Sequence, residues 1–310
     1  MRFFSRKIFI AAAFILGISV PAAASQAGRA AGSFMKIPAG ARASALGESF
    51  TAVKGSPDSV HWNPAGTAYI DSMSHSLSYM LWVEDMGYGN YSFVYPGIHG
   101  GVLGAGVSFL SLPSTTVTLE DEFGVYAGTG GSFKAGFYKF SAGYAREIVP
   151  GLSGGLNLKM IQETLDSETG RAFAADIGVL SPGLLSGKLD AALTLQNLGT
   201  RLKVYSHSAP LPLTLRAGGA FRVSDNLLGV SDIVYDFDSG AGISAGAEYR
   251  IHDIIKFRAG YKYSSAFSND PVKGVRAGWG IMKLPFELDY AFIPFGDLGE
   301  AHTVSVIYSF

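Results

Sequence analysis

From about residue 74 to the C-terminus, apolar and polar residues alternate with a period of two rather than 3.6. The clearest stretch is 211–223, which places its leucines on one face and Arg216 and Arg222 on the other. Successive side chains of a strand point to opposite sides. The pattern therefore predicts strands with one apolar face and one face that carries charges.

The alternation predicts fourteen strands of an all-β fold. Most are about nine to thirteen residues long, which suits a tilted strand that crosses a bilayer. They lie near residues 74–82, 88–96, 101–111, 132–146, 151–165, 171–181, 188–198, 211–223, 226–237, 241–251, 254–264, 274–282, 285–293 and 301–310.

The connections between these strands alternate in length. Short ones lie at 148–151, 224–226, 251–253 and 283–285, and longer polar ones at 112–131, 199–210, 265–273 and 294–300. Short turns on one side and long loops on the other are typical of an outer-membrane barrel, as is an even strand number. A soluble β-sandwich has no reason to sort its loops in this way. We therefore expect a fourteen-stranded antiparallel transmembrane β-barrel over residues 74–310.

The apolar face and the chain end support a lipid-facing barrel. Tyrosines and phenylalanines gather at strand ends on that face, as in the aromatic girdles of membrane barrels. The last strand alternates and ends on Phe310, which we interpret as the signal read by the outer-membrane assembly machinery. Outer-membrane lipid and that machinery are thus expected partners.

Residues 1–24 have the pattern of a secretory signal peptide. Arg2, Arg6 and Lys7 precede an unbroken apolar run from Ile8 to Ile18, and an Ala-Ala-Ala cleavage site follows. The run is too short for a membrane-spanning helix. We therefore expect export to the cell outer membrane.

Composition narrows the function. Of 310 residues, 48% are hydrophobic and 16% charged, which is poor in charge for a soluble domain. Lys and Arg number 24 against 25 Asp and Glu, so no electrostatic argument favours nucleic acid. The absence of cysteine excludes disulfides, thiolate metal sites and cysteine nucleophiles.

Residues 25–73 do not alternate, and we expect them to form a plug inside the barrel. A short helix is predicted to open within 38–47 and to run to about Val53, followed by a turn at 54–59. A box then follows, made of Trp62, Asn63, Pro64, Ala65 and Gly66. Proline biases the preceding residue away from the helical region, and Asn can bond its own nearby backbone. The box therefore predicts a turn, with ligand gating as the alternative.

Both ends of the chain resemble the PorV/PorQ family. At the N-terminal end the resemblance covers 40–53, which includes Gly40, Arg42 and Gly47, and the 62–66 box. At the C-terminal end it covers the closing hairpin 288–299. That family is similar to the FadL-like long-chain fatty-acid transporters, which share an Asn-Pro-Ala box. The resemblance implies a fourteen-stranded barrel with an N-terminal plug in its lumen. The chain departs from the family pattern at His61 and at Glu48-Ser49.

No catalytic or metal-binding constellation stands out. The two G-x-S-x-G matches, around Ser153 and Ser244, lie in alternating strands rather than in a strand–turn–helix. The six histidines are scattered singly, and the acidic run 120–122 is interpreted as a solvated loop. We therefore expect no enzyme activity, no cofactor and no metal.

The inward-facing charges are the strongest functional signal. They include Arg216, Arg222, Glu248, Arg250, Arg258, Glu287 and Asp289. Their mixed signs favour pairing with one another and with the plug, whereas a selective ion pathway usually carries one sign.

Two functions remain. The resemblance implies a non-enzymatic component of a type IX-like protein secretion or surface-attachment system, which binds exported cargo or secretion subunits through loops 112–131, 199–210 and 265–273. The alternative is a FadL-like transporter of fatty acids or other hydrophobic small molecules. Inward positions that are mostly charged, Gly or Ser disfavour an apolar pocket in the wall, although one between plug and wall near Phe34, Ile37, Leu46 and Phe50 stays open.

Overall fold

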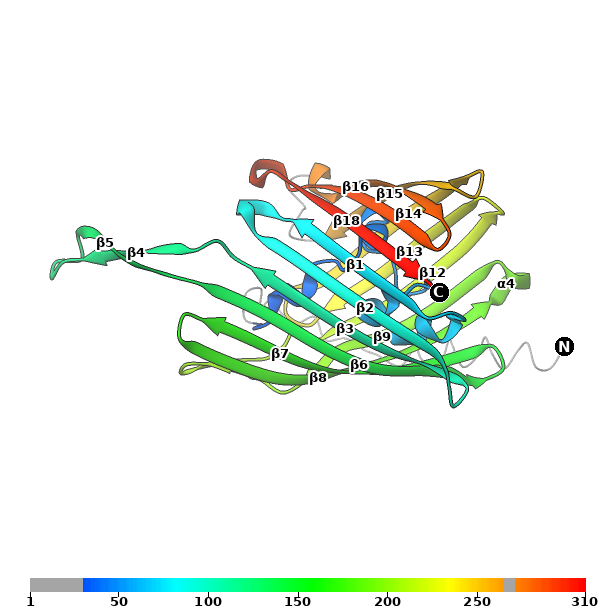
Figure 1. Cartoon of the computed structure of the whole chain (residues 1–310), viewed down its shortest axis with the longest axis horizontal. Helices are drawn as coiled ribbons and strands as arrows, with labels where there is room; N and C mark the ends of the chain where they lie inside the picture. The colour runs from blue at the N-terminus through cyan, green and yellow to red at the C-terminus, as the bar shows by residue number, and fades with distance from the viewer. Residues whose placement is uncertain (1–29, 265–270) are drawn as a thin grey trace.

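A computed structural model of the protein describes residues 30–264 and 271–310, and the expected signal peptide lies outside them. Fourteen strands form a closed antiparallel barrel in which neighbours in sequence pair and β1 (Ser74–Leu81) closes onto β18 (Glu300–Ser309). Figure 1 shows the barrel, the short helices inside it and a long hairpin that projects from one end. The expected fold class is confirmed.

The remaining barrel strands follow the sequence order. They are β2 (Gly87–Ile98), β3 (Gly101–Ser111), β6 (Ala135–Val149), β7 (Leu152–Leu165), β8 (Glu168–Gly183), β9 (Leu189–Gly199), β12 (Thr214–Ser224), β13 (Leu227–Asp236), β14 (Gly240–Ile251), β15 (Ile255–Ser264), β16 (Val275–Lys283) and β17 (Phe286–Pro294).

One of the larger departures at the start of a predicted strand has a simple cause. The alternation predicts a strand from 211, but β12 begins at Thr214. Pro210 and Pro212 have no backbone N–H, so neither can donate a ladder hydrogen bond. Leu211 and Pro212 instead fold inward and are buried.

Two long connections contain hairpins of their own, which the alternation did not predict. One, β4 (Thr115–Glu120) with β5 (Tyr126–Phe133), projects far beyond the barrel wall (Figure 1). The other, β10 (Leu202–Val204) with β11 (His207–Ala209), lies against the barrel and buries Leu202 among apolar side chains. We call the end of the barrel that carries these hairpins the long-loop end, and the opposite end the short-turn end.

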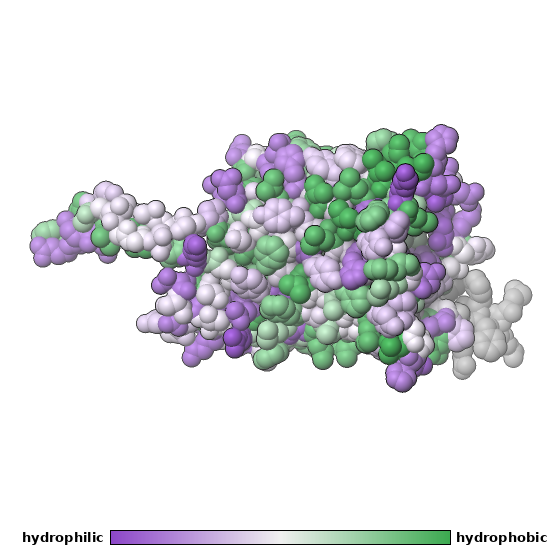
Figure 2. Space-filling view, viewed as in Figure 1, coloured by the Kyte–Doolittle hydropathy of each residue, from purple (hydrophilic) through white to green (hydrophobic). Residues whose placement is uncertain are grey.

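The two faces of the wall differ as the alternation predicts. Outward side chains such as Leu158 and Ile233 are about 60% exposed, at 59% and 62%, and apolar residues cover much of the wall in Figure 2. Tyr91, Tyr95 and Tyr249 are among the exposed aromatics on this face. Inward positions of the same strands are buried although many are polar or charged. Burying so many polar groups requires partners inside the lumen.

Those partners come from residues 30–73, which run through the barrel as four short helices. They are η1 (Ser33–Lys36), α2 (Ala41–Ala45), α3 (Ser59–Trp62) and η2 (Pro64–Tyr69). We refer to residues 30–73 as the plug. Outside it the described chain has only single turns: η3 (Val83–Asp85), α4 (Leu184–Gly187), η5 (Pro271–Gly274) and η6 (Gly296–Leu298). None of the helices in residues 30–264 and 271–310 is long and apolar enough to cross a membrane.

The helix expected to open within 38–47 and run to about Val53 is too long, because α2 ends at Ala45. Gly47 has a φ of +71°, a conformation that favours glycine. A Cβ on Gly47 would also lie 2.8 Å from the backbone N and O of Tyr261. The wall therefore forces the chain to turn where local sequence would continue the helix.

Candidate functional site

One ion-pair network joins the plug to the wall at α2. Arg42 donates two hydrogen bonds to Glu248, at 2.8 Å from Nε and 2.9 Å from Nη2. Glu248 also accepts from Arg258 at 2.7 Å, and Arg258 bonds Asp289 at 2.5 Å and Glu287 at 3.3 Å. Burial, the largest single cause, would lower the pKa of Arg42, but the charges of Glu248, Glu287 and Asp289 together with the hydrogen bonds to Glu248 raise it above the ordinary value. The geometry makes Arg42 a bidentate anchor for the plug.

A second cluster holds the turn after α2. Asp232 accepts hydrogen bonds from the Thr51 hydroxyl at 2.6 Å and from two plug backbone N–H groups at 3.2 Å. Arg216 pairs with Asp232 at 3.0 Å and donates to the Glu48 carbonyl at 2.6 Å. Its guanidinium also lies 4.9 Å from the ring centroid of Trp62. Arg216 of the wall thus contacts the plug through the Glu48 carbonyl and the Trp62 ring.

Further ion pairs hold the plug along its length. Glu48 accepts from Lys262 at 2.6 Å, and Lys54 pairs with Asp190 at 3.1 Å. Lys36 pairs with Asp238 at 2.6 Å, just beyond β13. Five of the seven inward charges named above therefore belong to networks inside the barrel. They are Arg216, Glu248, Arg258, Glu287 and Asp289.

The other two lie at the short-turn rim. Arg222 donates to the Gly187 carbonyl at 2.7 Å, and Arg250 pairs with Asp253 at 3.3 Å. Phe310 is 63% exposed at the same end, where its N–H bonds the Met73 carbonyl at 2.9 Å and its ring contacts Tyr308. Arg222 also lies 3.5 Å from Asp190, the partner of Lys54 in the plug, whereas Arg250 and Phe310 join none of the plug networks. None of the three lines the cavity described below.

The 62–66 box forms a turn that is pressed against the wall. The Asn63 side chain accepts from the Ala65 N–H at 3.1 Å and donates to the Thr51 carbonyl at 2.9 Å, so it caps η2. A Cβ on Gly178 of β8 would overlap Asn63 Oδ1, and a Cβ on Gly155 of β7 would lie 2.5 Å from the Ala65 nitrogen. Inward glycines on two wall strands thus provide the space that the box occupies.

The residues of the two G-x-S-x-G matches also hold the plug. Ser153 of β7 donates to the Ala65 carbonyl at 3.1 Å, and Ser244 of β14 lies 2.7 Å from the Ser49 hydroxyl. The acidic run 120–122 lies exposed at the tip of the β4–β5 hairpin. Among the described residues, no group of His, Asp or Glu is arranged to hold a metal ion.

At the long-loop end, the lumen of the barrel is apolar rather than polar. Buried side chains of this mouth layer include Phe34 and Ile37 from the plug and Met80, Tyr88, Leu110, Ile161 and Ile293 from the wall. Partly buried Trp82, Met86, Phe137 and Phe295 pack on them. The expectation that inward positions are mostly charged, Gly or Ser therefore does not hold in this layer. The inner face changes character along some strands: β17 has Asp289 in its middle and Ile293 at its mouth end.

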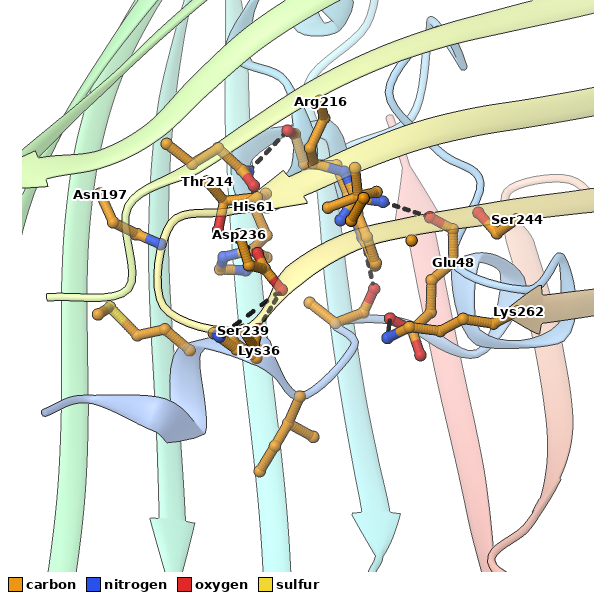
Figure 3. Close-up of a pocket in the computed structure, with 18 of the residues that line it drawn as sticks. Lys36, Glu48, His61, Asn197, Thr214, Arg216, Asp236, Ser239, Ser244 and Lys262 are labelled. Carbon is orange, nitrogen blue, oxygen red and sulfur yellow. Dashed lines mark hydrogen bonds and ion pairs between the residues drawn. The ribbon is translucent and has the colours of Figure 1, made fainter. Parts of the chain in front are cut away.

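A cavity of about 170 Å³ lies between the mouth layer and the charged networks. Its lining includes Lys36, Ile37, Glu48, His61 and Trp62 from the plug, and Lys139, Gln196, Asn197, Thr214, Arg216, Asp236 and Lys262 from the wall. Figure 3 shows several of these polar side chains around the space. The cavity occupies the boundary between apolar and polar zones.

His61 is an unsatisfied polar side chain of this cavity. It is buried, and neither ring nitrogen has a hydrogen-bond partner within the described residues. Burial, with Lys139 and Lys159 nearby, holds the pKa of His61 well below its ordinary value. The imidazole is therefore neutral, with one N–H donor and one acceptor. Sequence reasoning could not find this site, because its residues come from separate strands.

Replacing Arg42 with methionine tests the plug anchor. We expect the variant to lose about 1.5–3 kcal/mol of docking free energy, as is usual for hydrogen bonds to charged groups. Hydrogen–deuterium exchange should then become faster across residues 41–53. The matched control is Arg171→Met, since Arg171 is exposed and bonds only Gln162 in the described contacts. Unchanged exchange in 41–53 of the Arg42 variant would contradict the anchor.

Replacing Gly178 with alanine tests the packing of the box. The added methyl group overlaps Asn63, so we expect a loss of about 1–3 kcal/mol in urea unfolding followed by tryptophan fluorescence. Gly131→Ala is the control, because a Cβ there meets no atom within 4 Å. Equal unfolding midpoints for the two variants would show that the wall does not hold the box.

Comparison with protein-family models and with curated proteins finds no match. Solved structures do match. The Pseudomonas putida toluene transporter TodX is 12% identical with a TM-score of 0.61, covering 88% of this chain and 98% of TodX.

The Ralstonia pickettii toluene transporter TbuX is 13% identical with a TM-score of 0.59, covering 88% of this chain and 97% of TbuX. A Pseudomonas aeruginosa FadL homologue is 11% identical with a TM-score of 0.59, covering 88% of this chain and 99% of that one. At these identities the likeness concerns the fold: the chain is a barrel of the kind that these outer-membrane transporters have.

Proposed function

We propose that the protein lies in the outer membrane and passes hydrophobic small molecules inward from the long-loop end. The observation that carries this proposal is the apolar mouth layer inside the barrel. A lumen that served only to hold a plug would not require apolar side chains at the face that receives outside molecules. Long loops of such barrels face the cell exterior, so the mouth layer is the first surface that an entering molecule meets.

The mouth layer offers a continuous apolar surface. Trp82 and Phe295 lie edge to face at its rim, with ring centroids 6.4 Å apart, and Phe34 contacts Phe137 deeper in. Aromatic side chains supply large apolar areas for binding. Ile37 and Met35 belong to this layer and also line the cavity. A hydrophobic molecule can therefore pass from mouth to cavity along one apolar surface.

The contacts of the plug determine the second step of the proposed transport, which is release toward the periplasm. η2 bonds Ser153 at the short-turn end of β7, and Lys54 pairs with Asp190 at the same end of β9. Lys54 and η2 of the plug therefore lie in the short-turn half, below the cavity. Release toward the periplasm requires some of these contacts to open. Likeness of fold to toluene transporters and to a FadL homologue supports the proposal but names no substrate.

The secretion function of the PorV/PorQ resemblance is a second candidate, and one observation favours it. The β4–β5 hairpin extends away from the barrel, and its tip exposes Phe123 at 81% and Tyr126 at 67% beside the acidic run 120–122. Such an arm suits contact with another protein, because exposed aromatics recur at interfaces. It is not needed for a pathway through the lumen.

The mouth layer is tested by Trp82→Glu. A charge at the rim removes apolar surface, and burying a large apolar side chain is worth about 1.5–3 kcal/mol, so uptake should fall about tenfold. The measurement is the initial rate of labelled toluene uptake by cells that carry the protein as their added outer-membrane channel. Leu298→Glu is the control, since Leu298 is 61% exposed at the same end but outside the mouth layer. If cells that carry the wild-type protein take up toluene no faster than cells without it, the proposed transport is refuted.

Deleting residues 115–133 separates the two candidate functions. If the protein is a transporter, toluene uptake should persist, because the hairpin lies outside the lumen (Figure 1). Display of exported proteins should also be unchanged, and surface proteomics of the same cells measures it. Lost display with normal uptake would instead assign the protein to secretion.

A further inference from the structure

We propose that the cavity binds a compact organic carboxylate, whose anionic group pairs with Lys139 and hydrogen-bonds His61. The inference rests on the proposed transport function and deepens it by naming the class of molecule that the cavity holds. Such a carboxylate differs from the purely apolar ligand that the mouth layer alone would suggest.

Lys139 is the first ground for the proposal. It faces inward from β6, opposite Ser108 and Ile161 in the two neighbouring strands, and is only 3% exposed. Across residues 30–264 and 271–310, no hydrogen bond or ion pair of its ammonium group is recorded, although the side chain lines the cavity. A buried cation without a carboxylate is costly unless an anion reaches it.

The acids around it are already engaged. Asp176 pairs with Lys159 at 2.6 Å and accepts the Asn197 N–H at 2.8 Å. Glu48 is taken by Lys262 and Asp232 by Arg216, as described above. Lys36 has both Asp238 at 2.6 Å and Asp236 at 3.6 Å. The other cations of the cavity are therefore paired, and Lys139 is the one that offers its charge to a guest.

His61 is the second, independent ground. Its backbone carbonyl accepts from the Gln196 amide at 3.0 Å, which fixes α3 beside the wall, while both ring nitrogens stay unpartnered among the described residues. A neutral imidazole contributes one N–H donor, and a carboxylate has two oxygens that accept. Lys139 and His61 line the same cavity, where they offer a carboxylate a cation and an N–H donor.

The remaining lining selects an organic and compact acid. Trp62 and Ile37 from the plug and Val234 from the wall add apolar surface to the same cavity, which an inorganic anion would not use. The cavity volume of about 170 Å³ is small, since pockets for drug-sized ligands span roughly 300–1,000 Å³. A carboxylate on a single ring or a short chain is the size that fits.

Titration calorimetry of the purified, detergent-held full-length protein tests this with benzoate and its neutral counterpart, benzyl alcohol. The wild type should bind benzoate about tenfold or more tighter, since hydrogen bonds to charged groups typically contribute tenfold or more to affinity. Lys139→Met should remove that difference and leave benzyl alcohol binding unchanged. Lys139→Arg should keep most of it, because the charge stays.

Lys203→Met is the matched control, since Lys203 is an exposed lysine of β10 and should leave both affinities unchanged. Equal wild-type affinity for benzoate and benzyl alcohol would overturn the proposal even if the Lys139 variants fail to fold. Tight benzoate binding that survives Lys139→Met would overturn the assignment to Lys139. Acetate binding as tightly as benzoate would overturn the role of the apolar lining.

The experiments distinguish a refuted carboxylate site from a refuted transport function. Benzoate binding that depends on Lys139, without toluene uptake by cells, would refute the proposed transport and leave the carboxylate site standing. Toluene uptake without selective benzoate binding would refute the site and leave transport standing.

Discussion

Fourteen strands enclose more space than the side chains of their own wall can fill, so the plug has to supply both volume and polar partners. The pairing of Arg42 with Glu248 illustrates the dependence. Without the plug, Glu248 would lose one of its two cations and Asp232 its three plug donors. A buried charge that loses a partner is strongly destabilising. The polar inner wall and the polar plug therefore require each other.

The wall was predictable because its signal is local. Alternation with a period of two is visible within any ten residues, and β14 at Gly240–Ile251 departs by one residue from the expected 241–251. The plug was harder, since tertiary contacts decide its shape. α2 stops early because the Tyr261 backbone lies against Gly47, and the turn at Asn63 is set by Gly178. Neither contact can be inferred from neighbours in sequence.

The candidate site shows the same division. Inward charges such as Arg258 could be identified by parity along a strand, but their grouping depends on register between strands. The apolar mouth layer could not be predicted in this way, because its wall residues, such as Met80 and Ile293, lie at the mouth ends of only some strands, where the alternation ends. A charge count taken over whole strands averages the two zones together. Position along the strand, and not only its parity, carries the functional information.

The cavity lies where the apolar mouth layer meets the charged networks, and this position determines what it can bind. An apolar layer above and charged networks below give an amphiphilic molecule one favoured orientation, with its polar group toward the plug. Glu48 and His61, where the chain departs from the PorV/PorQ pattern, both line this cavity. Glu48 is paired with Lys262, whereas His61 is open to a guest. A ligand that engages His61 thus contacts the plug itself, and its binding free energy acts on the element whose contacts close the short-turn half of the barrel.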